Sequence, residues 1–184
     1  MGLRVTFDLH DDDLEHFRLI MQEARSTAAR VAPEDIVAAA QDLLETIGDS
    51  GAPGFILERL GKLRLMIDML SDLEWRLPHQ EAGRVLNALA YFTEPEDLIP
   101  DDIPGLGFLD DAIMIELIAR ELKHEIEAYQ DFCDYRTRKR SEGGRQTRVS
   151  REDWLESRRS ELQTRMRRRK RSERPGRGHS GLFK

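Results

Sequence analysis

The chain has 184 residues, of which 39% are hydrophobic and 35% are charged. This length is sufficient for one domain with an appendage, or for two small domains. No stretch approaches the roughly eighteen consecutive apolar residues that a membrane-spanning helix needs, so the sequence predicts no such helix. Cys133 is the single cysteine, which excludes an internal disulfide and a cysteine-based zinc site. We therefore expect a cytoplasmic protein.

The net charge of -6 conceals a strong asymmetry. Residues 1–135 contain 11 lysines and arginines against 29 acidic residues, a net charge of -18. Residues 136–184 contain 18 against 6, a net charge of +12. The sequence thus predicts an acidic body with a basic tail. Such an asymmetry suggests that the basic part has a polyanionic partner.

The apolar residues of the body recur with helical spacing. Between residues 54 and 76, for example, Ile56, Leu60, Leu63 and Ile67 fall on one stripe. Pro33 and Pro78 suit the first turns of helices. We expect five helices, at about residues 11–24, 33–48, 54–76, 78–92 and 111–138. The predicted fold class is all-α, a bundle of about five helices within residues 1–140.

The composition changes after residue 140. The Gly, Ser and Thr content of residues 141–150 predicts a linker. Ser150 and Asp153 have the spacing of a capping box, which predicts that a basic helix begins there and covers residues 151–171. Few large apolar residues support this helix, so we expect a lone helix that docks through Trp154 or folds on a partner. Residues 172–184 are predicted to be disordered.

Residues 97–111, DLIPDDIPGLGFLDD, predict a rigid corner before the last helix of the body. A residue that precedes proline favours extended backbone, and glycine adopts conformations that other residues avoid. Asp110 is expected to cap the following helix, with Asp111 in its first turn. The residues assigned to the corner and the cap are Pro100, Pro104, Gly105, Gly107, Asp110 and Asp111.

The same corner resembles the diagnostic run of the YkvA-like family, a bacterial domain of unknown function numbered 1232. The run P-x-D-L-I-P-D-x-I-P-x-L-G-x-L-D-D is matched here from Pro95 to Asp111. The resemblance covers about forty residues, with a family-like core at about residues 80–120. It implies no established activity. Some members look membrane-associated, whereas this chain looks like a soluble form.

Three aspartates of the corner have no role in the capping of the helix: Asp97, Asp101 and Asp102. Oxygen ligands in a tight loop suit Mg²⁺, Ca²⁺ or Mn²⁺, so a divalent cation is possible here. The alternative is that each carboxylate binds backbone N–H groups of the turn. The spacing is not that of an EF-hand, and no familiar catalytic motif is present. The sequence therefore favours a protein that is not an enzyme, and we expect no cofactor.

Glu125 is predicted to face the apolar side of the last body helix. A charge in that position needs a partner, and the helical wheel of the third helix favours Arg59. The pair would be a buried ion pair that fixes the register of two helices. The alternative is a carboxylate in a pocket with a raised pKa.

The basic tail carries the strongest functional signal. Six of residues 165–171 are Lys or Arg, and the planar guanidinium group suits phosphate. We expect an accessory or adaptor protein that binds nucleic acid or the ribosome without sequence preference. Alternatives are an anionic membrane surface, a protein partner, or docking of the tail on the acidic body. The expected nucleic-acid-binding residues are Arg165, Arg167, Arg168, Arg169, Lys170, Arg171 and Arg174.

Overall fold

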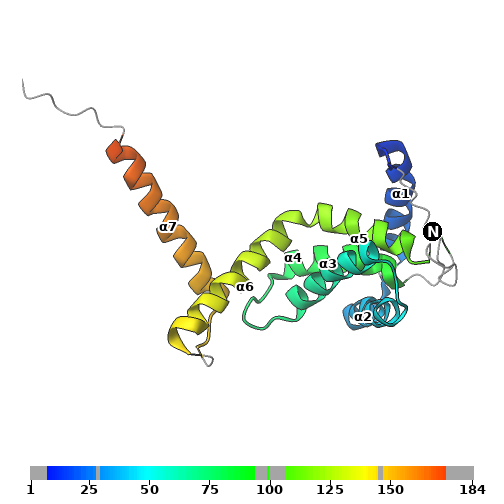
Figure 1. The fold of residues 1–184 in the computed structure, drawn as a ribbon, viewed down its shortest axis with the longest axis horizontal. Helices are drawn as coiled ribbons and strands as arrows, with labels where there is room; N and C mark the ends of the chain where they lie inside the picture. Colours follow the sequence, from blue (N-terminus) through cyan, green and yellow to red (C-terminus); the bar gives the residue numbers. More distant parts are fainter. Residues whose placement is uncertain (1–7, 28–29, 94–98, 100–106, 145–146, 173–184) are drawn as a thin grey trace, which may run out of the picture. The chain divides into compact units, whose positions relative to one another are not determined.

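A computed structural model describes residues 8–27, 30–93, 99, 107–144 and 147–172, without the side chains of Thr27 and of residues 170–172. Within these ranges the chain forms seven α-helices and no strand, which confirms the predicted all-α class (Figure 1). The helices are α1 (Asp11–Thr27), α2 (Pro33–Asp49), α3 (Gly54–Ser71), α4 (His79–Leu89), α5 (Leu109–Glu121), α6 (Lys123–Gly143) and α7 (Arg151–Ser172), and a 3-10 helix η2 covers Ala90–Thr93.

The chain divides into two compact units, Met1–Asp131 and Phe132–Lys184. The first unit contains α1 to α5 and the beginning of α6. The second contains the rest of α6 and all of α7.

The core of the first unit is built around α3. This helix packs on α5 and α2, and η2 fills the space beside α1, α2 and α4. Apolar residues at helical spacing supply the core because they fall on one face of each helix. The fully buried side chains include Ile47 of α2, Ile56, Leu63, Met66 and Met69 of α3, Leu89 of α4, and Met114, Ile115 and Ile118 of α5.

A polar cluster closes the connection between α3 and α4. The carboxylate of Asp72 accepts hydrogen bonds from the backbone N–H groups of Glu74 (2.9 Å) and Trp75 (3.1 Å) and from the Tyr129 hydroxyl (3.0 Å). The Trp75 ring lies 5.6 Å from the Tyr129 ring and is almost completely buried. Asp72 and Trp75 therefore tie the end of α3 to α6.

The single long helix predicted over residues 111–138 is wrong. The structure contains two helices in this part of the chain. They are separated at Leu122, where the backbone angles are φ -95° and ψ 20°, so that α5 ends at Glu121 and α6 begins at Lys123. No proline or glycine lies at this position. Leu122 is fully buried, and tertiary packing is therefore the physical reason that we assign to the break.

In the second unit, the end of α6 and the start of α7 pack together. The Tyr135 hydroxyl donates a hydrogen bond to the carbonyl of Asp153 (3.4 Å), and Trp154 is buried. Ser150 and Asp153 form the predicted capping box: each backbone N–H donates to the other side chain, at 2.9 and 3.1 Å. The Asp153 carboxylate also accepts a hydrogen bond from the Ser150 hydroxyl (2.8 Å), and the two bonds from the Ser150 backbone N–H and hydroxyl hold the pKa of this carboxyl below its usual range.

Candidate functional site

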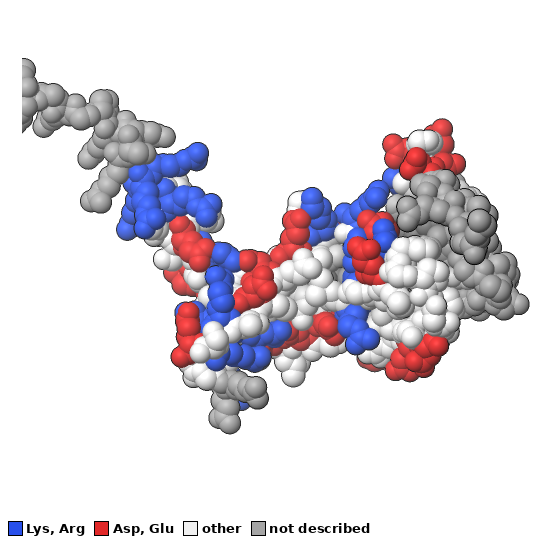
Figure 2. All heavy atoms as spheres, in the orientation of Figure 1, with Lys and Arg blue, Asp and Glu red and all other residues white. Residues whose placement is uncertain are grey.

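The arginines of α7 form an exposed basic surface. Figure 2 shows Lys and Arg atoms gathered over the C-terminal half of this helix. Because successive residues of an α-helix differ by about 100°, Arg165, Arg167 and Arg168 point in different directions around the axis. We call the following four exposed side chains the arginine cluster: Arg165, Arg167, Arg168 and Arg169. Lys170 and Arg171 belong to α7, but their side chains, like the whole of Arg174, lie outside the described residues.

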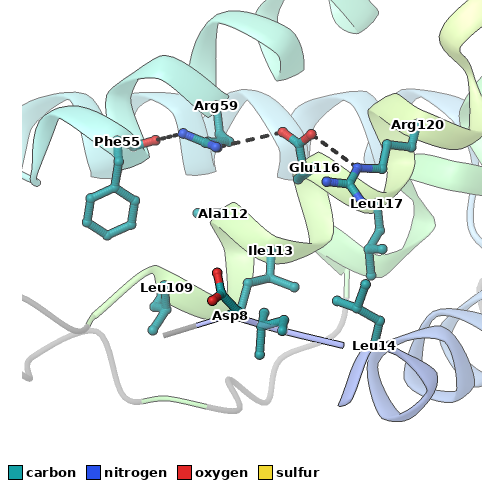
Figure 3. Close-up of a pocket in the computed structure, with 11 residues that line it drawn as sticks. Asp8, Leu14, Phe55, Arg59, Leu109, Ala112, Ile113, Glu116, Leu117 and Arg120 are labelled. Atoms are coloured by element: carbon teal, nitrogen blue, oxygen red, sulfur yellow. Dashed lines mark hydrogen bonds and ion pairs between the residues drawn. The ribbon is translucent and has the colours of Figure 1, made fainter. Parts of the chain in front are cut away.

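The first unit carries an open groove with a volume of about 460 Å³, lined by α1, α3, α5 and the residues just before α1 (Figure 3). Its apolar lining comes from three segments: Leu9 and Leu14 around the start of α1, Phe55 of α3, and Leu109 and Ile113 of α5. We call this feature the α1–α3–α5 groove. Sequence periodicity could not reveal it, since its lining residues come from three separate segments.

Glu116 lines the groove between Arg59 and Arg120 and binds three cations (Figure 3). Its carboxylate lies 2.5 Å from Lys62 Nζ, 3.3 Å from Arg120 Nε and 3.6 Å from Arg59 Nε. Burial acts to raise the pKa of Glu116, but the hydrogen bonds and charges of Lys62 and Arg120 outweigh it, so the pKa lies below its usual value of 4.5. Glu116 is therefore ionised at neutral pH, and it joins α3 to α5.

The lowered pKa predicts a pH-dependent effect of Glu116→Gln. A carboxyl with a depressed pKa in the folded state stabilises it above the pKa of the unfolded chain, and this contribution disappears as the pH falls through the folded-state pKa. We expect the substitution to lower the free energy of unfolding at pH 7 by at most about 1 kcal/mol, since the cluster is partly solvated. The difference from wild type should shrink as the pH falls below 4.5 through the folded-state pKa, measured by urea denaturation at pH 7 and at successively lower pH. A difference that does not change with pH would contradict this account, and the exposed Glu45→Gln serves as control.

The predicted ion pair between Arg59 and Glu125 is wrong. Arg59 binds Glu58 (3.3 Å) and Glu116 (3.6 Å), whereas Glu125 binds Arg84 of α4 at 2.5 Å. The Glu125 side chain is only 11% exposed, so its predicted inward position agrees with the structure. The wrong partner follows from treating residues 111–138 as one straight helix. The break at Leu122 changes the angular position of every later residue relative to α5.

The predicted cap at Asp110 also differs from the structure. The helix begins one residue earlier, at Leu109, and its N-cap position is Phe108, a left-handed residue with φ 64°. Asp110 is almost completely buried inside the first turn, and its carboxylate accepts the backbone N–H of Ile99 at 3.0 Å. Asp111 lies in the first turn as predicted and is also buried. Asp110 therefore binds the chain eleven residues upstream.

Most of the remaining corner lies outside the described residues: Asp97, Pro100, Asp101, Asp102, Pro104 and Gly105. Gly107 is described and is buried. Within the ranges that the structure covers, no three His, Cys, Asp or Glu side chains are grouped closely enough to hold a metal ion. The metal hypothesis for Asp97, Asp101 and Asp102 stays a prediction. None of the helices in the described part has a stretch apolar and long enough to cross a bilayer.

Comparison with known proteins identifies a family segment within this fold. Residues 83–117, from α4 through the corner to most of α5, match the model of a family described as "Protein of unknown function (DUF1232)". The predicted resemblance is thereby confirmed for this part of the chain. The segment contributes Leu109, Ile113 and Glu116 to the α1–α3–α5 groove.

One relative is the "Uncharacterized membrane protein YkvA" of Bacillus subtilis (strain 168). It is 46% identical over 43 residues, which are 23% of this chain and 41% of the relative. The match thus spans less than half the length of either protein. No solved structure matches the chain.

Proposed function

We propose that this protein is a non-enzymatic accessory or adaptor protein that binds nucleic acid, free or in the ribosome, through the arginine cluster of α7. The observation that carries this proposal is that Arg165, Arg167, Arg168 and Arg169 are all exposed residues of α7. Among the described positions of this helix, no acidic residue follows Glu161. Arginine binds phosphate through paired N–H groups and releases counterions from the polyanion.

The arrangement of the arginines around α7 favours a nucleic acid over a flat membrane surface as the binding partner. The arginines point in several directions, so a flexible or grooved polyanion can contact more of them at once than a plane can. Such contacts carry no base-edge readout, and we therefore propose binding without sequence preference. The proposal includes the predicted organisation of the chain: an acidic body over residues 1–140, a linker over 141–150 and then the basic helix. It also includes the predicted cytoplasmic location.

A second candidate is binding to an anionic membrane surface. The Bacillus relative is named a membrane protein, which favours this candidate, and each basic residue near an anionic bilayer contributes about 1 kcal/mol. A third candidate, a metal-dependent or pocket enzyme, depends on Asp97, Asp101 and Asp102. It predicts a rise in melting temperature with added Mg²⁺ or Mn²⁺ that Asp101→Asn removes.

The test replaces the arginine cluster with glutamine in the full chain. Binding to labelled single-stranded RNA and DNA is measured by fluorescence anisotropy at two salt concentrations. We expect the Kd at low salt to rise at least about tenfold, and the slope of log Kd against log salt to fall by about 3, since each phosphate contact on a single strand contributes about 0.7. The matched control replaces four exposed arginines elsewhere with glutamine: Arg18, Arg30, Arg64 and Arg138.

Two results would overturn the proposal: equal loss of affinity in the cluster and control variants, or no binding of the wild-type chain to either nucleic acid. Vesicles with and without phosphatidylglycerol form the parallel arm of the experiment. Binding to anionic vesicles in the absence of nucleic-acid binding would establish the second candidate instead.

A further inference from the structure

The helix α7 carries a line of exposed apolar side chains beside its arginines. Leu155, Leu162 and Met166 are 49%, 56% and 60% exposed. Their spacing of seven and four residues places them within about 40° of one another around the helix axis, so they form one continuous line. We call these three residues the α7 stripe. Apolar side chains that line up on an exposed face indicate a contact surface.

Arginines border the α7 stripe on both sides. On a helix surface, the neighbours of a residue lie three and four positions away. The four such neighbours of Leu162 are one residue of the stripe and three arginines: Met166, Arg158, Arg159 and Arg165. Arg158 binds Glu161 at 2.7 Å. Arg159 and Arg165 are both exposed, and each lies about 60° from Leu162, on opposite sides of it.

The acidic residues of α7 point away from this part of the stripe. Glu156 and Glu161 directly follow Leu155 and Leu162 in the sequence, and each therefore points about 100° away from its apolar neighbour. Glu152 is a helix neighbour of Leu155 in the first turn, but no described neighbour of the other two stripe residues is acidic. The ligand that suits this surface is therefore both apolar and negatively charged.

A single strand of nucleic acid offers this combination at its surface, whereas a duplex does not. In a duplex the faces of the bases are stacked inside. In a single strand the bases can turn outward and lie against side chains while the phosphates contact basic residues. A bilayer is a poorer fit, because helices bind it through a broad apolar face, and the α7 stripe has three residues on a helix of 22.

We propose that the α7 stripe contacts the faces of unpaired bases, and that the nucleic acid that α7 binds is therefore single-stranded. This inference rests on the proposed function. Leu162 and Met166 lie against the bases, and Arg159 and Arg165 bind phosphates on either side of them. Every base has a face, so these contacts tolerate any sequence.

The test measures binding of the full chain to labelled DNA of about fifteen nucleotides, as a single strand and as a duplex of the same sequence, by fluorescence anisotropy. Binding through phosphates alone favours the duplex, because its charge density is greater. We expect the opposite order, with a Kd for the single strand at least about fivefold lower. A single strand with abasic sites at its central positions keeps the phosphates and should bind at least about fivefold more weakly than the intact strand.

Replacement of the stripe tests which residues cause this preference. Leu162→Ala together with Met166→Ala should raise the Kd for the single strand at least about fivefold and change the Kd for the duplex less than about twofold. The slope of log Kd against log salt should stay the same, because no phosphate contact is removed. The matched control is Ser160→Ala together with Thr164→Ala, two exposed residues on the opposite side of α7, which should change neither Kd more than about twofold. Alanine favours a helix, and circular dichroism confirms that α7 is retained.

Three results would overturn this inference and leave the proposed function standing: a duplex bound as tightly as the single strand, equal binding of the intact and abasic strands, or equal losses in the stripe and control variants. Loss of binding to phosphatidylglycerol vesicles in the stripe variant, with its single-strand binding unchanged, would assign the stripe to a lipid surface and overturn the inference as well. Absence of binding to both single strand and duplex would overturn the proposed function and this inference together.

Discussion

Trp75→Ala is expected to lower the free energy of unfolding by about 3–5 kcal/mol, the usual cost of removing a buried aromatic side chain. Trp75 is 1% exposed, and its ring lies 5.6 Å from that of Tyr129. Removal leaves a cavity between the end of α3 and α6, and the rigid bonds of Asp72 to this turn limit how far the surroundings can collapse. Trp75→Phe, which retains part of the ring volume, should cost less.

The measurement is urea denaturation followed by circular dichroism, because the substitution removes a fluorophore. Leu73→Ala is the control: Leu73 lies two residues before Trp75 in the same turn and is 85% exposed. Its substitution should change the stability by less than about 0.5 kcal/mol. Equal losses for the two substitutions would show that the turn, rather than the buried ring, determines the stability.

Asp110→Ala is expected to lower the free energy of unfolding by about 2–3 kcal/mol. The Asp110 carboxylate is 1% exposed and binds the backbone N–H of Ile99. Removing an acceptor while its donor stays in place costs the desolvation of that donor, and the deleted side chain leaves a buried void. Asp110→Asn keeps one oxygen acceptor and should cost clearly less than the alanine variant.

Asp68→Ala is the control for Asp110→Ala, because Asp68 is an exposed aspartate within α3 and its removal should have little effect on stability. Both variants are followed by thermal and urea denaturation. If Asp110→Ala were as stable as Asp68→Ala, the bond to Ile99 would contribute nothing to the corner that precedes α5.

The sequence was sufficient for the helical class and for most helix positions, because apolar residues at spacings of three and four mark α2, α3 and α4 clearly. The predicted capping box of Ser150 and Asp153 is also confirmed, since both of its bonds form between residues three positions apart. Features that depend on local chemistry were thus accessible from the sequence alone.

Features that depend on tertiary packing were not accessible. The break at Leu122 lies in a run without proline or glycine, so no local signal marks it, and the wrong partner for Arg59 followed from the assumption of a continuous helix. Aspartate is a common helix-capping residue, yet the carboxylate of Asp110 binds the backbone N–H of Ile99, eleven residues away. The α1–α3–α5 groove joins segments that are separated by more than a hundred residues of sequence, such as Asp8 and Arg120, and periodicity within one helix cannot relate them.

The exposed arginine cluster on α7 also affects how the protein behaves during purification. A chain with a pI near 5.5 is expected to bind an anion exchanger and to pass through a cation exchanger at neutral pH. Because the arginines form a separate exposed surface, this chain should be retained by both resins and by heparin. Retention on heparin therefore reports the local charge density of one helix. Recognition of a nucleic acid is reported only by the loss of salt-dependent affinity for RNA or DNA in the arginine variants.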